Sequence, residues 1–243
     1  MALKILITND DGVDTVGIRL LAKWAQKYGE VTVIAPKVEQ SAKSHSINIR
    51  GAFEIKRVPF IDGIEAYSCD SSPADCVRYG VLGLKRKFDL VLSGINRGVN
   101  VGDDIVYSGT CAAIFEAARL GMKGIAFSAF FDGQEQASAY FDDAYNYIIE
   151  NGMLDANPIY NVNIPNVPKG IKVTYQGSIY YSDEFLPCPE AGEDMFRQDG
   201  EIIPDECPND LNRDTVAIHA GYISITPLIV SRTDMAIFEK FKN

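Results

Sequence analysis

The feature that most constrains the fold is a run of apolar residues that ends in an acidic turn. Residues 3–8 read Leu-Lys-Ile-Leu-Ile-Thr, and Asn9-Asp10-Asp11-Gly12 follows at once. A nearly continuous apolar run is typical of a strand covered on both faces of a parallel sheet. In such sheets, ligands bind at the carboxyl ends of the strands. The sequence therefore predicts an α/β fold with a ligand site at this turn.

The adjacent carboxylates of Asp10 and Asp11 are costly at that position. They repel each other, and burial penalises their charge unless a cation or hydrogen-bond donors compensate. An acidic turn after a strand is common, so the pair taken alone is evenly balanced between a metal site and a plain turn. If a metal compensates, oxygen ligands of this kind suit Mg²⁺ or Mn²⁺.

Alternating strand and helix patterns run through the first two thirds of the chain. Apolar residues between 17 and 28 recur at helical spacing, and residues 31–35 form a second apolar run. This strand, helix and strand order predicts a parallel βαβ unit. The same reasoning predicts strands within 49–58, at 64–68, 88–93, 123–128 and 159–164, and helices at 71–84, 108–120 and 135–150.

The pattern changes after Pro165. Residues 173–181 and 215–227 have strand character, while residues 182–212 contain four prolines and many acidic residues. A short helix is expected at 232–241. We expect an α/β core over 1–165 and a C-terminal part over 166–243, made of strands, an extended arm and a terminal helix that pack on the core. Projecting hairpins are a common route to oligomers.

Composition excludes several classes of protein. The formal net charge of -10 and the pI near 4.7 argue against a stable complex with nucleic acid, which favours basic surfaces. No run approaches the roughly 20 apolar residues of a membrane span, and no signal peptide is evident. Five cysteines without a C-x-x-C pair argue against a disulfide framework. We therefore expect a cytoplasmic protein without a membrane partner.

The polar loop over 37–48 lies on the same predicted sheet edge as the acidic turn. Ser41 could add a hydroxyl ligand there, although loop composition alone favours an ordinary serine-rich connection. His45 is either an exposed loop residue or an outer partner of the site, and the first interpretation is favoured because no second histidine ligand is near in sequence.

A second long loop, over 94–107, joins the strand at 88–93 to a helix. Loops of this length in a compact domain are usually functional or disordered, and the strong flanking elements favour function. Asn96 and Asn100 offer neutral oxygens and donors, and Asp104 stands near the helix start. Because a helix N-terminus presents free N–H groups, Ser108-Gly109-Thr110 is predicted to bind phosphate.

Several enzyme motifs are absent or unconvincing. No G-x-x-x-x-G-K-[ST] or G-x-S-x-G sequence occurs, and the glycines of 94–102 do not follow the dinucleotide-binding order. Cys207 and Arg213 match the C-x5-R spacing of cysteine phosphatases. The intervening residues have no glycine and place a carboxylate where a dianion would sit, so we interpret this match as chance.

Five sequence blocks occur in the order of one family's motifs. They are Ile5 to Gly12, Ala35-Pro36 with Ser41, Ser44 and Ser46, Pro73 to Val77, Ser93 to Gly102 with Tyr107 to Thr110, and Gly221 to Leu228. Together they span nearly the whole chain. The sequence resembles the SurE (stationary-phase survival protein) nucleotidase family.

The resemblance implies a Rossmann-like three-layer core with a mostly parallel sheet and a C-terminal hairpin arm, assembled into homodimers or homotetramers. It implies hydrolysis of nucleoside 5′- and 3′-monophosphates with one Mg²⁺ or Mn²⁺ per subunit. The implied metal ligands are Asp10, Asp11, Ser41 and Asn96. The implied catalytic and phosphate-side residues are Asn9, Asp104, Ser108, Gly109 and Thr110, with Asn100 in the same motif.

The sequence departs from the family pattern at three places. Ala42 replaces a glycine usual after the ligand serine, Ser71-Ser72 replaces a G-T pair, and the arm from Ser182 is acidic and irregular. The substrate preference, the metal used in the cell and the oligomeric state are therefore left open. The alternatives to a hydrolase acting through activated water are a non-catalytic nucleotide- or metal-binding regulator and a metal-dependent transferase.

Overall fold

A single nine-stranded sheet forms the centre of the computed structural model, which describes residues 2–242. Its strand order is β3-β4-β2-β1-β5-β6-β7-β11-β8. The central strands are mutually parallel: β1 (Leu3–Thr8), β2 (Gly29–Pro36), β4 (Glu65–Cys69), β5 (Leu90–Arg97), β6 (Lys123–Ala129) and β7 (Ile159–Ile164). Antiparallel pairing is confined to β3 (Ile55–Val58) against β4 and β11 (Ile223–Pro227) against β7, while β8 (Ile171–Val173) runs parallel to β11.

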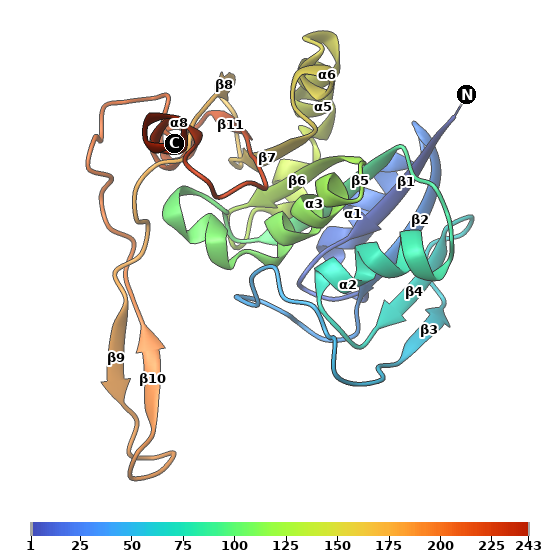
Figure 1. Ribbon diagram of the computed structural model, residues 1–243, viewed down its shortest axis with the longest axis horizontal. Helices are drawn as coiled ribbons and strands as arrows, with labels where there is room; N and C mark the ends of the chain where they lie inside the picture. Colours follow the sequence, from blue (N-terminus) through green and yellow to red (C-terminus); the bar gives the residue numbers. More distant parts are fainter. Residues whose placement is uncertain (1, 243) are drawn as a thin grey trace.

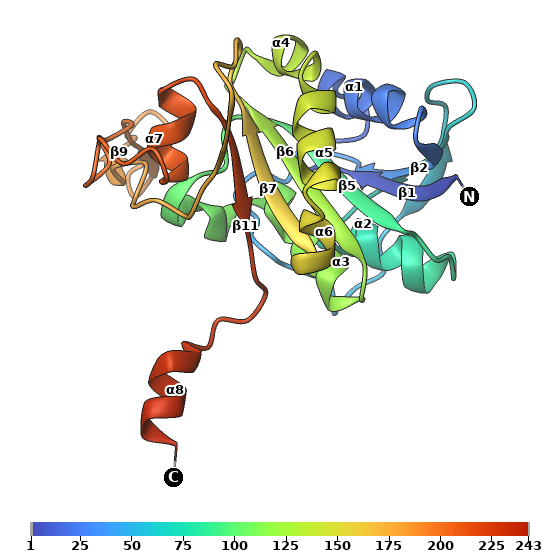
Figure 2. The same cartoon turned by 90° about the horizontal axis from the view of Figure 1, so that it is seen from above.

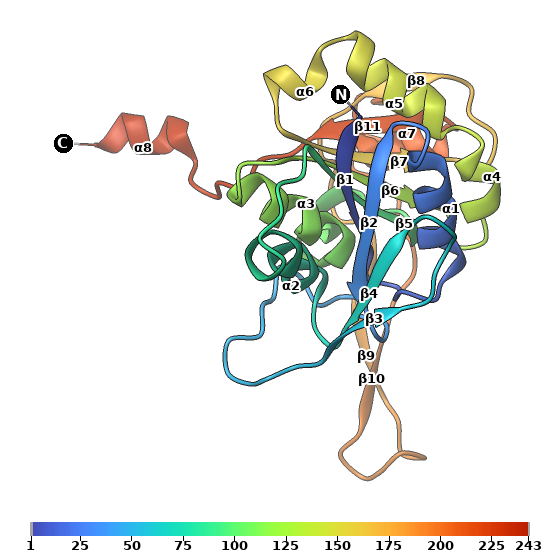
Figure 3. The ribbon, with the colours of Figure 1, turned by 90° about the vertical axis from the view of Figure 1, so that its right-hand side faces the viewer.

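Helices cover both faces of this sheet, which gives three layers (Figure 3). One face carries α1 (Val16–Ala25), α4 (Gln134–Ser138) and α5 (Phe141–Glu150). The other carries α2 (Pro73–Arg78), which continues into the π-helical turn Tyr79–Gly83, and α3 (Gly109–Arg119). The predicted α/β fold with a mostly parallel sheet is confirmed.

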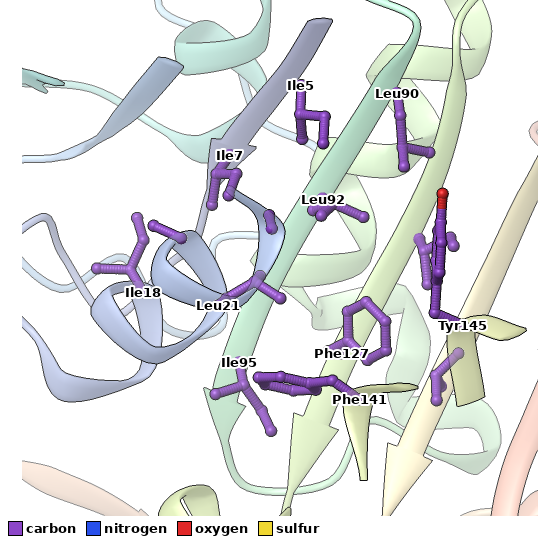
Figure 4. Close-up of a cluster of buried hydrophobic side chains, with 14 of the residues drawn as sticks. Ile5, Ile7, Ile18, Leu21, Leu90, Leu92, Ile95, Phe127, Phe141 and Tyr145 are labelled. Atoms are coloured by element: carbon purple, nitrogen blue, oxygen red, sulfur yellow. The ribbon is translucent and has the colours of Figure 1, made fainter. Parts of the chain in front are cut away.

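The larger core cluster lies between the sheet and α1, α4 and α5 (Figure 4). The apolar face predicted for α1 is buried there through Ile18 and Leu21. Phe127 of β6 and Phe141 of α5 meet edge to face, with their ring centroids 5.3 Å apart. These side chains hold the strand ends in place, because close-packed cores allow little rearrangement.

Residues beyond 165 contribute both to the core sheet and to two projecting segments. Strands β8 and β11 extend the core sheet past β7. The division into two parts at residue 165 remains a prediction. An antiparallel pair, β9 (Glu184–Pro187) and β10 (Phe196–Asp199), forms a long arm (Figures 1 and 3). The terminal helix α8 (Met235–Phe241) extends away from the body and buries none of its residues (Figures 2 and 3).

Three expected elements differ from those observed. The helix expected at 135–150 is split into α4 and α5, which lets Phe141 turn into the core. The strand expected at 173–181 ends at Val173, because the Gly177 N–H donates to the buried Asp214 carboxylate and not to a neighbouring strand. The first half of the strand expected at 215–227 is a helix, α7 (Asp214–His219). Short apolar segments are ambiguous between helix and strand, and tertiary contacts decide.

Candidate active site

The acidic turn lies at the switch point of the sheet. Strand β1 has β2 on one side and β5 on the other, and the chain runs from β1 to β2 before it returns to β5. A crevice is expected at the carboxyl ends of two such strands. Asp10 and Asp11 follow β1, and Asn96 lies near the end of β5. The Arg97 N–H donates to Asp11 Oδ2 at 3.3 Å, which joins the two strand ends.

Asn9 shapes this turn from inside. Its side chain is fully buried, donates to Gly12 O and Thr15 Oγ1 at 3.0 Å each, and accepts the Gly12 N–H at 3.2 Å. These contacts fix the backbone that presents Asp10 and Asp11. The catalytic role expected for Asn9 remains a prediction, and the structure gives its side chain a positioning role in the turn.

The Asp10 carboxylate packs against the start of α3. Thr110 Oγ1 donates to Asp10 Oδ1 at 2.5 Å. A Cβ atom at Gly109 would lie 2.8 Å from Asp10 Cβ, so only glycine allows this approach. Ser108 caps the helix by accepting the Cys111 N–H at 3.0 Å. The sequence predicted that Ser108, Gly109 and Thr110 bind phosphate; the structure places all three beside Asp10 and commits the Thr110 hydroxyl to it.

Among the described residues, neither carboxylate is neutralised by an ion pair, although the charge of Arg97 slightly favours the ionised form of Asp11. Asp10 is only 4% exposed, and within residues 2–242 neither Asp10 nor Asp11 has an ion-pair partner. Burial raises the pKa of Asp10, opposed by hydrogen bonds from Thr110. Burial, and next the charge of Asp10, raises the pKa of Asp11 to about 6. The turn therefore carries the electrostatic cost that the sequence predicted, and a cation would relieve it.

The other two expected metal ligands lie at the same edge. Ser41 is exposed, and its hydroxyl donates to Glu39 Oε1 at 2.7 Å. The Asn96 side-chain nitrogen donates to Gly98 O at 2.7 Å, which leaves the side-chain oxygen as the donor for a cation. Two carboxylates, a hydroxyl and an amide oxygen are hard oxygen donors and fit Mg²⁺ or Mn²⁺. Residues 2–242 contain no cluster of three or more His, Cys, Asp or Glu side chains suited to a metal.

A cleft of about 960 Å³ brings several predicted residues together with residues that sequence reasoning missed, while Asn9, Asp11, Gly109 and Thr110 do not line it. Its lining includes Asp10, Ser41, Asn96, Asn100, Asp104 and Ser108. The base of the arm supplies another wall through Tyr181, Asp183, Phe185, Gln198, Asp199 and Gly200. The acidic, irregular sequence of the arm gave no sign of this contribution, because only the tertiary structure brings the base of the arm beside the 94–107 loop.

Asn100 is held by a buried polar network. Its side chain donates to Ser128 Oγ at 2.8 Å, and its carbonyl accepts from the side chains of Asn161 (2.7 Å) and Asn163 (2.9 Å). Asn161 and Asn163 are fully buried at alternate positions of β7. Two asparagines within an apolar strand were a sequence signal that could have revealed this network, since buried amides require partners.

Asp104 stands at the cleft wall in a 3₁₀ turn (Gly102–Tyr107), and its Oδ2 is buried without a hydrogen-bond partner. Burial is the main cause that raises the pKa of Asp104, and the charge of Asp183 is the second.

His45 differs from the favoured expectation of an exposed residue. Its Nε2 lies 2.9 Å from Glu116 Oε2, and its side chain is 20% exposed.

The fold and the site define the general class: an α/β protein that binds its ligand at the switch point of a mostly parallel sheet, here with oxygen donors suited to a divalent cation. Residues 5–183 match the family model "Survival protein SurE". Relatives named 5'-nucleotidase SurE include one from Thermoanaerobacter sp. (strain X514), 37% identical over 96% of this chain and 94% of its own length. Another, from Clostridium beijerinckii, is 38% identical over 97% of this chain and 96% of its own length. The crystal structure of the SurE protein from Aquifex aeolicus superposes with a TM-score of 0.80 at 33% identity and covers 98% of both chains. The chain belongs to the SurE family.

None of the helices in residues 2–242 combines the length and the apolar character needed to cross a bilayer.

Proposed function

We propose that this chain is a phosphoric monoester hydrolase that converts nucleoside 5′-monophosphates, and also 3′-monophosphates, to nucleoside and phosphate. The observation that carries the proposal is a single cleft lined by oxygen donors, by the start of α3 and by exposed aromatic side chains. Relatives of 35–38% identity that are named 5'-nucleotidase SurE support the same reaction.

The proposed metal ligands are Asp10, Asp11, Ser41 and Asn96, with one Mg²⁺ or Mn²⁺ per subunit. A divalent cation bound there supplies charge to neutralise the phosphoryl group and to make a water molecule acidic. Asn9 and Thr110 hold the carboxylates in orientation through the contacts described above. The burial of Asp10 and Asp11, which raises the pKa of both, supports this assignment, since a cation would relieve its cost.

The proposed phosphate contacts are at the start of α3. The Gly109 N–H and the Ser108 hydroxyl lie where a helix N-terminus favours anions, whereas the Ser108 N–H already donates to Ile105 O at 3.2 Å; Asn100 lines the same cleft. Asp104 is the proposed proton carrier for the leaving oxygen, because its raised pKa lets it hold a proton nearer neutral pH than an ordinary carboxyl. The set contains no strongly activated nucleophile, so direct attack by water is proposed.

The aromatic side chains of the cleft are the proposed nucleoside-binding part. Tyr107, Tyr181 and Phe185 are 53%, 42% and 68% exposed, respectively, and all three line it. Exposed aromatic faces suit stacking with a nucleobase. Gln198 adds an amide to the same wall, where its side-chain nitrogen donates to Asp183 Oδ1 at 2.8 Å.

A phosphate-release assay tests the proposal. The substrates are a panel of nucleoside monophosphates and glycerol phosphate, assayed with EDTA and after Mg²⁺ or Mn²⁺ is restored. We expect release from nucleotides that is lost on chelation, restored by metal and weaker for glycerol phosphate, which lacks a base. Activity that survives complete chelation would refute the metal assignment. Nucleotide binding without release would instead favour a regulator.

Asp10→Asn tests the assigned ligand directly. Turnover should fall by at least about a hundredfold, because even changes outside a metal's first ligands cost 10–100-fold. Exposed Asp14 of the same turn provides a control in Asp14→Asn, which should leave turnover unchanged. A single turnover in ¹⁸O-water should place the label in phosphate; label in an enzyme carboxylate would refute direct attack by water.

The proposed assembly is a homodimer or homotetramer in the cytoplasm. Apolar side chains are exposed on the arm at Met195 and Phe196 and on α8 at Phe238 and Phe241, which supports contacts with further copies. All five cysteines are free thiols, which supports a reducing compartment. Light scattering of a variant lacking residues 182–212 should show a smaller assembly than the full chain.

A further inference from the structure

A buried carboxylate on α3 binds three cationic or ionisable side chains from different segments. Glu116 is 2% exposed. Its oxygens lie 2.9 Å from His45 Nε2, 2.9 Å from Arg78 Nη1 and 3.2 Å from Arg119 Nε. Burial alone would raise the pKa of Glu116, but the hydrogen bonds from His45 and Arg78 outweigh it and the pKa is lowered. Glu116 therefore joins α2, α3 and the 37–54 loop.

The 37–54 loop, which carries Ser41, needs such anchors. It passes through the left-handed region at Ala42 (φ 56°) and Ser44 (φ 53°), which residues other than glycine rarely adopt. Residues held in sparsely populated conformations persist when the surrounding structure determines them. This loop is therefore shaped by contacts outside it.

Those contacts lie on both sides of the strained residues. On one side, the Gln40 N–H donates to Asp10 O at 2.7 Å. On the other, Ser72 Oγ donates to Ser46 O at 2.6 Å, and His45 reaches Glu116. The Ser44 N–H also donates to Tyr107 O at 3.0 Å, directly before α3, and the His45 side chain ties the loop to α3 itself, the helix whose first residue packs on Asp10. Gly109 and Glu116 lie about two turns apart on this helix.

We propose that His45 and Glu116 are positioning residues, whose contact fixes the Ser41 loop relative to Asp10 and so completes the metal site. The inference rests on the proposed metal-dependent function. Neither residue lines the cleft, so neither touches the substrate. The contact acts by holding Ser41 at a fixed distance from the acidic turn through the α3 helix.

His45→Ala is the direct test, because Glu116 keeps Arg78 and Arg119 as partners, so we expect the variant to fold. Calorimetric titration with Mn²⁺, without substrate, should show binding weakened about tenfold, the scale of outer partners of metal ligands. At saturating Mn²⁺, kcat should stay within about twofold of wild type. His45→Gln keeps a donor for Glu116 and should restore most of the affinity. Lys43→Ala, at an exposed position of the same loop, is the control and should bind Mn²⁺ like wild type.

A double variant separates positioning from a general loss of stability. If His45 acts through Ser41, His45→Ala should add little to the loss of Mn²⁺ affinity caused by Ser41→Ala, because the two changes remove one effect. Hydrogen exchange of metal-free His45→Ala should rise at residues 40–48 and stay unchanged in the central strands. Glu116→Gln should give the same pattern of exchange.

Three results would overturn the inference. They are unchanged Mn²⁺ affinity in His45→Ala, losses that multiply in the double variant, and exchange that rises throughout the core. If wild type binds Mn²⁺ but the variants give one of these three results, the proposed function stands and only the positioning role is wrong. If wild type binds no Mn²⁺, both the proposed function and the inference are wrong.

Discussion

Removing the charge of Asp11 should stabilise the metal-free protein while abolishing its activity. Burial and the neighbouring Asp10 raise the pKa of Asp11 from 3.8 to about 6. At about 1.4 kcal/mol per pKa unit, this shift corresponds to roughly 3 kcal/mol of destabilisation above pH 6. Asp11 is partly exposed, and screening by water leaves about 1–2 kcal/mol. Asn at this position can still accept the Arg97 N–H.

The sign follows from proton binding. Between pH 3.8 and about 6, the folded metal-free chain holds the Asp11 proton that the unfolded chain has lost. The contribution of Asp11 to stability is therefore greatest at low pH and falls as the pH rises through this window. The stability of Asp11→Asn should lack this pH dependence. Its free energy of unfolding should therefore exceed that of wild type at pH 7.5 and nearly equal it at pH 4.

Urea unfolding in EDTA, followed by the fluorescence of the single tryptophan, Trp24, measures this difference. Asp11→Asn should be more stable than wild type in EDTA at pH 7.5, and saturating Mn²⁺ should reverse the order because only wild type gains binding energy. Asp14→Asn, at an exposed neighbouring acid, should change stability by less than about 0.5 kcal/mol. An Asp11→Asn protein that is less stable than wild type in EDTA at pH 7.5 would refute the reasoning.

Three further substitutions test the packing around the site. Gly109→Ala places a methyl group 2.8 Å from Asp10 Cβ, so Mn²⁺ affinity measured by calorimetry should fall; unchanged affinity would contradict this close approach. Phe127→Ala leaves a cavity beside Phe141 and should lower the free energy of unfolding in urea by about 3–5 kcal/mol. A loss well below this range would show that the core collapses around the missing ring. Ala42→Gly relieves a left-handed backbone and should raise stability by up to about 1 kcal/mol, a gain that a lower urea midpoint would exclude.

The sequence by itself determined most elements of the parallel core and the centre of the site. The apolar run before Asp10 specified a buried parallel strand, and the N-cap residues Ser72 and Ser108 marked the starts of α2 and α3. These signals are local, because strand burial, capping and helical spacing depend on neighbours within a few residues. Strand direction placed the loops that carry Asp10, Ser41 and Asn96 at one edge of the sheet, and the structure shows these residues lining one cleft.

Only the tertiary structure decided the features that depend on distant partners. Residues 214–219 form a helix and not a strand, since Asp214 is buried against Gly102 and Gly177, which are far away in the sequence. The arm closes one wall of the cleft. His45 leaves the surface to bind Glu116, 71 residues further along the chain. A buried polar group needs a partner, but its own sequence neighbourhood does not say which one, so contacts of this kind are fixed only when the whole chain packs.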